Sequence, residues 1–154
     1  MKLLSPRIKG AIQVRVAAIM LFTKAFWWLI WVRLGLRFLP FAKLQSKVDR
    51  ISKMTVRSPG YYSILGLIWS VETATKFMPG GAKCLARAMT TQILMGQNSY
   101  PYELCIGVQK DSTGELKAHA WIESEQKIII GWLPEIDRYK RLEKRFYQGM
   151  ASSL

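Results

Sequence analysis

The sequence of 154 residues has one histidine, two cysteines and only 10 acidic residues against 23 basic ones. Two cysteines are too few for a disulfide framework, so we expect two free thiols in a reducing cytosol. No small-residue cleavage site follows the N-terminal apolar run, as a secretory signal would require. Half of the residues are hydrophobic, which is enough to bury a core as one compact unit with an appended N-terminal element.

The excess of basic residues gives a net charge of +13 and a pI near 10.1. This balance predicts an anionic partner, which could be nucleic acid, an anionic membrane surface or an acidic peptide. The basic residues are scattered along the chain, and neither a single recognition helix nor an aromatic-interleaved ribonucleoprotein motif emerges. We therefore do not expect nucleic acid as the partner.

Residues 11–39 are apolar and helical in composition, and Pro6 is expected to limit any earlier helix. Lys24 and Arg33 interrupt the apolar run, so no unbroken span of 18 apolar residues exists. Three interpretations compete: a transmembrane helix, an interfacial helix on an anionic leaflet, and a helix that packs on the domain or on a partner protein. The last two are favoured, because a lysine in the middle of a membrane span is costly.

A basic amphipathic segment, residues 41–53, follows Pro40, and its three apolar residues at helical spacing should pack in the core: Leu44, Val48 and Ile51. Ser58, Pro59 and Gly60 form the clearest boundary in the chain. The sequence is therefore divided into a basic, apolar helical region, residues 1–57, and a second domain, residues 58–154.

The second domain begins with two predicted helices, residues 61–78 and 84–95, separated by Pro79-Gly80-Gly81. In the first helix we expect an ion pair between Glu72 and Lys76 and an apolar stripe made of Leu65, Ile68 and Trp69. Three predicted strands follow, over residues 102–109, 116–123 and 127–132. Two helices followed by an antiparallel meander predict an α+β domain in which a helix packs on a small sheet.

The break at Pro79 to Gly81 places Cys84 at the start of a helix, where unpaired N–H groups and the helix dipole stabilise a thiolate. His119, the only histidine, lies in a strand about 35 residues later. A cysteine in this position is a candidate nucleophile if His119 lies within hydrogen-bond reach. The alternative is a packed cysteine and a structural histidine, since free cysteines are usually buried. Cys105 lies inside a strand-like run and is expected to be structural.

Three pieces of sequence carry a resemblance to a known family: Cys84-Leu85-Ala86-Arg87-Ala88, Ile106-Gly107-Val108, and His119-Ala120-Trp121-Ile122-Glu123. Between about residues 69 and 132 the chain resembles the leader peptidases of lasso-peptide biosynthesis, in the transglutaminase-like cysteine superfamily. The resemblance implies a papain- or transglutaminase-like domain with the nucleophile helix on a small antiparallel sheet. It also implies a cysteine protease that needs neither a cofactor nor a metal.

The third member of the site is the open point of the sequence interpretation. The resemblance implies an aspartate after the histidine strand, but residues 128–132 contain no acid. Glu135 or Asp137 could fold back to orient the imidazole, while Glu123 lies about 13 Å along the strand from His119, at about 3.3 Å per residue. Two further candidates have supporting roles: Arg87, to steady a carboxylate or the substrate, and Trp121, to wall the substrate groove or simply to pack.

The expected function is removal of the leader from a ribosomally made precursor peptide, through a Cys84 thioacyl intermediate with His119 as the base. The resemblance implies a separate leader-recognition protein and a lactam-forming cyclase as partners, in the cytoplasm or at the inner membrane face. Two alternatives stay open. One is a basic membrane- or nucleic-acid-associated adaptor without catalysis, and the other is a transglutaminase or amidase of the same superfamily.

Overall fold

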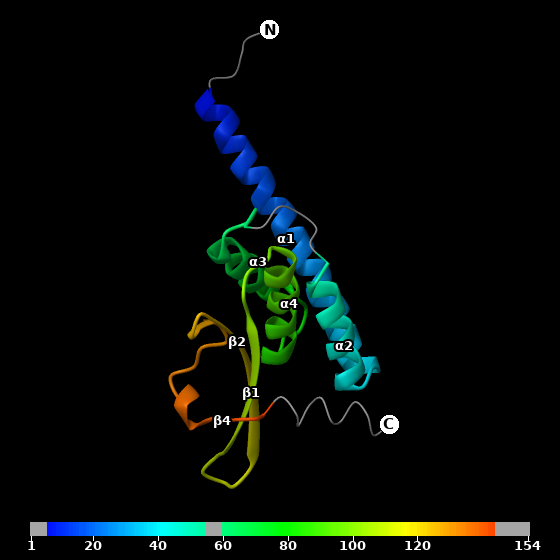
Figure 1. Ribbon diagram of the computed structural model, residues 1–154, viewed down its shortest axis with the longest axis vertical. Coiled ribbons are helices and arrows are strands. Elements are labelled where there is room, and N and C mark those ends of the chain that lie inside the picture. Colours follow the sequence, from blue (N-terminus) through cyan, green and yellow to red (C-terminus); the bar gives the residue numbers. More distant parts are fainter. Residues whose placement is uncertain (1–5, 55–59, 144–154) are drawn as a thin grey trace.

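The structure, a computed structural model, describes residues 6–54 and 60–143 (Figure 1). The predicted boundary at residues 58 and 59 and most of the basic tail lie outside these residues. Four helices come first in the chain: α1 (Pro6–Phe38), α2 (Phe41–Ser52), α3 (Ile64–Phe77) and α4 (Cys84–Gln97). Four strands and a short 3-10 helix follow: β1 (Glu103–Lys110), β2 (Leu116–Ser124), β3 (Lys127–Ile130), the 3-10 helix η1 (Ile136–Arg138) and β4 (Lys140–Arg141).

Helix α1 is 33 residues long and begins at Pro6, five residues before the start expected at residue 11. Proline is tolerated in the first turn because its missing N–H would have no helical partner there. The C-terminal part of α1 packs on α3 and α4 and buries Ala25, Leu29 and Val32, which lie on one helix face. Its N-terminal half projects beyond the rest of the molecule (Figure 1).

Helix α3 turns a different face to the core than the predicted one. Leu65 is 78% exposed and Trp69 is 49% exposed, and the buried stripe is made of Leu67, Val71 and Ala74. Both faces of this helix are apolar, so composition alone could not show which face its neighbours α1 and α4 would cover. Glu72 also has a different partner, since it pairs with Arg87 of α4 rather than with Lys76.

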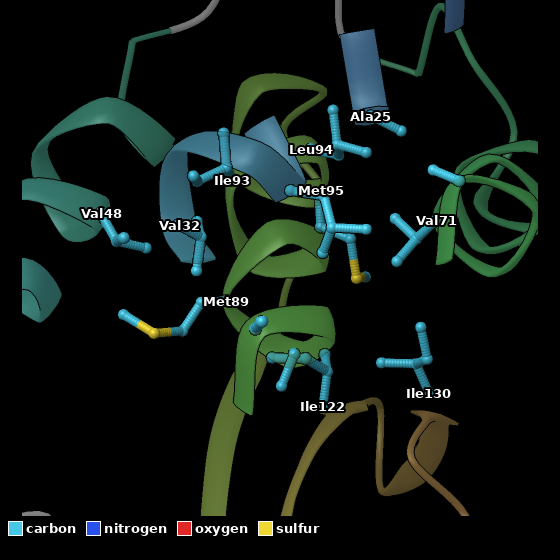
Figure 2. Close-up of a cluster of buried hydrophobic side chains, with 14 of the residues drawn as sticks. Ala25, Val32, Val48, Val71, Met89, Ile93, Leu94, Met95, Ile122 and Ile130 are labelled. Atoms are coloured by element: carbon cyan, nitrogen blue, oxygen red, sulfur yellow. The ribbon is translucent and has the colours of Figure 1, made fainter. Parts of the chain in front are cut away.

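Helix α4 is the centre of the molecule, and 10 of its 14 residues are buried. Side chains from the other helices and from the sheet converge on it (Figure 2). Leu44 and Val48 of α2 join this core and Ile51 packs against it, as predicted. The buried Gln92 donates a hydrogen bond of 2.6 Å to the carboxylate of Asp49, which fixes α4 to α2. The core therefore draws side chains from both sides of the predicted boundary.

The four strands form an antiparallel sheet in the order β3-β2-β1-β4. The meander β1-β2-β3 agrees with the sequence prediction, and the α+β class with a helix packed on a small sheet is confirmed. The strand β4 was not predicted. Strand β3 ends at Ile130, two residues earlier than expected, because Gly131 adopts a φ of +87° that leaves the extended conformation.

The two faces of the sheet have different surroundings. Ala120 and Ile122 of β2 belong to the hydrophobic core shared with the helices. Side chains alternate along a strand, so His119 and Trp121 point to the opposite face. Cys105, paired with Trp121 in the register of β1 and β2, shares that second face. We call it the outer face of the sheet, and the face covered by α4 the inner face.

Candidate active site

Cys84 is the first residue of α4 and follows the loop of residues 78–83, in which Gly80 and Gly81 have φ values of +72° and +67°. Its side chain is half-buried and packs against the edge of the core. The residue before it, Lys83, is the N-cap and provides no side-chain cap. Cys84 makes no side-chain hydrogen bond within residues 6–54 and 60–143.

Two interactions hold the loop that carries Cys84. Arg33 of α1 donates a hydrogen bond of 2.8 Å to the carbonyl of Pro79. Arg87, one turn after Cys84, forms an ion pair with Glu72 of α3 and so joins the helices on either side of the loop. The carboxylate that Arg87 contacts is therefore that of Glu72, and the ion pair links two helices.

His119 lies near the middle of β2 and is 9% exposed. Its Nε2 lies 2.7 Å from the carbonyl oxygen of Gly131. A carbonyl can only accept a hydrogen bond, so Nε2 carries the proton and Nδ1 is the basic nitrogen of the neutral ring. The ring stacks on Trp121 with centroids 6.1 Å apart and lies 5.6 Å from the ring of Tyr139.

The group that orients the imidazole is a main-chain carbonyl rather than a carboxylate. Glu135 and Asp137 are exposed, and within the described residues neither bonds to the imidazole of His119. Glu123 instead accepts a hydrogen bond of 2.7 Å from Trp121 Nε1. Gly131 lies within residues 128–132, the stretch where the resemblance implies an aspartate. Sequence reasoning missed it because every residue has a carbonyl; a glycine at the end of a strand was the only signal.

Cys84 and His119 are not bonded to each other in this structure. Cys84 packs against the core on the inner face of the sheet, whereas the ring of His119 points to the outer face and is bonded to Gly131. Helix α4 and strand β2 pack directly on one another. The two residues therefore belong to adjoining elements, but the alternation of β2 turns the imidazole away from the helix.

The outer face carries a second thiol, Cys105, which is 1% exposed, as its predicted structural role requires. Burial raises the pKa of the Cys105 thiol to about 12; the Arg141 guanidinium opposes this shift, and the carboxylates of Glu123 and Glu103 add to it. Arg141 lies 2.6 Å from the sulfur, 2.9 Å from Glu103 and 3.3 Å from Glu123. Glu103, Cys105 and Glu123 could hold a metal by residue type, but Arg141 already supplies their positive charge.

The fold and these residues define a class: an α+β domain in which a cysteine opens a buried helix and a histidine lies on the adjoining antiparallel sheet. A family model described as the transglutaminase-like superfamily matches residues 26–144. The chain belongs to this superfamily, whose members are typically Cys–His acyl-transfer enzymes. The match begins inside α1, so part of that helix is included in the family domain. Comparisons with curated proteins and with solved structures found no match.

Proposed function

We propose that this chain is a cysteine peptidase that removes the leader from a ribosomally made precursor peptide during lasso-peptide maturation. The observation that carries the proposal is the position of Cys84 in a transglutaminase-like chain: it opens the central helix, is half-buried, and has no hydrogen-bond partner among the described residues. The motif Cys-Leu-x-Arg-Ala that begins there, together with His-Ala-Trp-x-Glu, supports the leader-peptidase assignment over other members of the superfamily.

In the proposed reaction the Cys84 thiol gives its proton to His119, and the sulfur attacks the scissile carbonyl carbon, forming a C–S bond as the carbonyl oxygen becomes an oxyanion. The C–N bond then breaks, and the leaving amine takes that proton. Water hydrolyses the thioester and restores the thiol. Backbone N–H groups in the first turn of α4 would stabilise the oxyanion. The pair can act only if the His119 ring comes within hydrogen-bond distance of the sulfur, so the state that reacts differs from the arrangement described above.

The partners follow from this function. A separate leader-recognition protein would present the precursor, and a lactam-forming cyclase would take the released core peptide in the cytoplasm. The net charge of +13 supports an acidic leader as the ligand. A transglutaminase would form the same thioester but pass the acyl group to an amine. An amidase would hydrolyse a side-chain amide, so the product distinguishes these reactions from leader cleavage.

The test is cleavage of the neighbouring precursor peptide, with and without the leader-binding partner, followed by mass spectrometry. Cys84→Ala should reduce cleavage to background, and His119→Ala should reduce it by on the order of 10²- to 10⁴-fold. Residues that act as one unit are not additive, so the double variant should be no slower than Cys84→Ala alone. Cys105→Ala is the matched control and should cleave normally. Full activity in Cys84→Ala would overturn the proposal.

A membrane-surface role is supported by a separate observation on the projecting half of α1. The segment Ile12–Phe38 is long and apolar enough to cross a bilayer. Ile12, Val14 and Ile19 are 48%, 70% and 65% exposed, and they are not confined to one helix face. A helix that is apolar all round suits burial in a bilayer, and the chain's charge of +13 favours an anionic leaflet. We propose that the enzyme works at the inner membrane face.

Flotation with phosphatidylglycerol vesicles tests this role, with phosphatidylcholine vesicles as the neutral comparison. Wild-type protein should float with the anionic vesicles, and Val14→Asp combined with Ile19→Asp should reduce the floating fraction severalfold. Leu116→Asp, at a position on β2 that is 68% exposed, is the control for an added charge at an exposed apolar site. Equal flotation of all three proteins would exclude the helix as the membrane contact.

A further inference from the structure

A cavity of about 460 Å³ lies beside the start of α4, between the C-terminal part of α1 and the loop that carries Cys84. Every charged residue in its lining is cationic. Two of these cations come from α1 and the third is the N-cap of α4: Arg33, Arg37 and Lys83. The remaining lining residues are small or apolar: Leu36, Gly80, Gly81 and Ala86.

These three cations have no counter-charge within residues 6–54 and 60–143. None of them forms an ion pair there, although four other pairs are present. Arg33 is fixed by its hydrogen bond to the carbonyl of Pro79, which holds its guanidinium at the cavity wall. Like charges around one cavity repel each other, and an anion placed among them would be attracted by all three. The cavity therefore has the charge and the donors of an anion-binding site.

We propose that this cavity binds the carboxylate of an acidic residue in the peptide substrate. Arginine and carboxylate groups match in planar, bidentate geometry, which favours a carboxylate as the occupant. Two residues that line the cavity flank Cys84 in the sequence: Lys83 comes one position before it and Ala86 two positions after it. Both positions are within about one helical turn, or about 5.4 Å, of Cys84 along the helix axis. An extended peptide advances about 3.3 Å per residue, so the acid would lie within about three residues of the scissile bond. The inference names a substrate feature and rests on Cys84 being the nucleophile.

Alkylation of Cys84 with two matched reagents tests the site without a known substrate. Iodoacetate carries a carboxylate and iodoacetamide is its neutral counterpart. With either reagent the thiolate forms a C–S bond, the C–I bond breaks and iodide leaves. The quantity to measure is the ratio of the iodoacetate rate to the iodoacetamide rate at Cys84, relative to the same ratio for a short unstructured cysteine peptide.

The ratio for the wild-type protein should exceed that of the peptide, because the three cations around the cavity attract the carboxylate reagent to the start of α4. Arg37→Gln and Lys83→Gln should each lower it by about fivefold, which corresponds to one charge pair of about 1 kcal/mol in water. Both side chains are exposed, so the fold should be retained, and circular dichroism checks this. Lys127→Gln, an exposed lysine on β3, removes the same charge elsewhere and should leave the ratio unchanged.

An equal ratio in wild type, Arg37→Gln and Lys83→Gln would overturn the proposal. So would protection of Cys84 from iodoacetamide by inorganic phosphate or phosphatidylglycerol vesicles but not by glutarate, since the site would then be a phosphate or lipid-headgroup site. Glutarate protection that is lost in Arg37→Gln would support a carboxylate site. The alkylation rates test the anion site without any catalytic turnover. The cleavage assay with Cys84→Ala tests the peptidase proposal, so either proposal can be overturned while the other stands.

Discussion

The molecule has one thiol on either side of the sheet, Cys84 on helix α4 and Cys105 on strand β1, and the two are in opposite chemical situations. Cys84, on the inner side, is half-buried and begins a helix near three cations that form no ion pair in the described part of the chain. Cys105, on the outer face, is buried among two carboxylates and one arginine. The comparison shows that two residues of the same type differ in burial and in neighbouring charge, and this difference is the reason for proposing Cys84 as the nucleophile. It also shows that His119 shares a face with Cys105.

The largest expected difference is in the alkylation rates of the two thiols. The thiolate is the reactive form, and at about pH 8 only about 1 in 10⁴ of the Cys105 thiols is ionised, because its pKa is about 12. Iodoacetamide should therefore modify Cys84 on the order of 10³-fold faster, as measured by peptide mass mapping. In concentrated guanidinium chloride the two rates should converge. Equal rates in the folded protein would remove the contrast between the faces.

Gly131→Ala should change the hydrogen bond that holds His119 on the outer face. A Cβ there would come within 2.9 Å of the carbonyl oxygen of Ala120, and φ is +87°. We expect a loss of about 1–3 kcal/mol in the free energy of unfolding. Gly114→Ala is the control, because Gly114 has a similar φ of +85° with open space around it.

The same variant has a direct spectroscopic readout. The chain has one histidine, so ¹⁵N NMR of the imidazole gives a single pair of ring-nitrogen signals. Wild-type protein should show the tautomer with the proton on Nε2, and Gly131→Ala should shift these signals while Gly114→Ala should not. A wild-type proton on Nδ1 would contradict the assigned hydrogen bond and the role of Nδ1 as the base.

Arg141→Ala should lower the free energy of unfolding by about 1–2 kcal/mol. The substitution removes the partner of two partly exposed carboxylates, Glu103 and Glu123, and of the buried Cys105 thiol. Urea denaturation measures the change. Lys140→Ala, at the adjacent exposed position on β4, should have little effect. If the two variants were equally stable, the arginine would not hold the outer face together.

The smallest expected effect is on the pH dependence of stability. The pKa of Cys105 is about 12 in the folded state and about 8.5–9 in an unfolded chain, so the unfolded thiol loses its proton first. The stability that the buried, protonated thiol contributes to the fold is fully present below about pH 8.5 and is lost as the pH rises toward 12. Denaturation at about pH 7.5 and about pH 10 measures the free energy of unfolding, which should fall more between the two pH values for wild type than for Cys105→Ala. Equal losses would mean that Cys105 is not shielded from water.

Much of the fold could be predicted from the sequence because its signals are local. The break at Pro79 to Gly81 marks the start of α4, and apolar runs separated by turn residues mark β1, β2 and β3. The buried face of α3 could not be predicted, because Leu65 and Trp69 are as apolar as Leu67 and Val71. The strand β4 consists of Lys140 and Arg141 and has no apolar alternation. Its pairing with β1 depends on tertiary contacts.

The sequence offered candidates for the site but not their full geometry. Residue type and position at a helix start made Cys84 a candidate nucleophile, and His119 became the candidate base because it is the only histidine. The face to which His119 points depends on whether α4 covers the even or the odd positions of β2. The even positions from 116 to 122 are apolar, whereas Lys117, His119 and Glu123 stand beside Trp121 at the odd ones. This alternation favours the even positions as the side covered by α4, which turns His119 outward. The acceptor from Gly131 is a main-chain atom, which no side-chain motif encodes.

The hydrogen bond from Arg33 to the Pro79 carbonyl has a mechanical consequence. Helix α1 is 33 residues long, which corresponds to a rod of about 50 Å, and one end of it projects freely (Figure 1). Because this hydrogen bond joins the helix to the loop five residues before Cys84, we expect a displacement of the helix to move the loop that carries Cys84. Binding at the outer end of α1 would therefore also affect the loop of residues 78–83 beside Cys84.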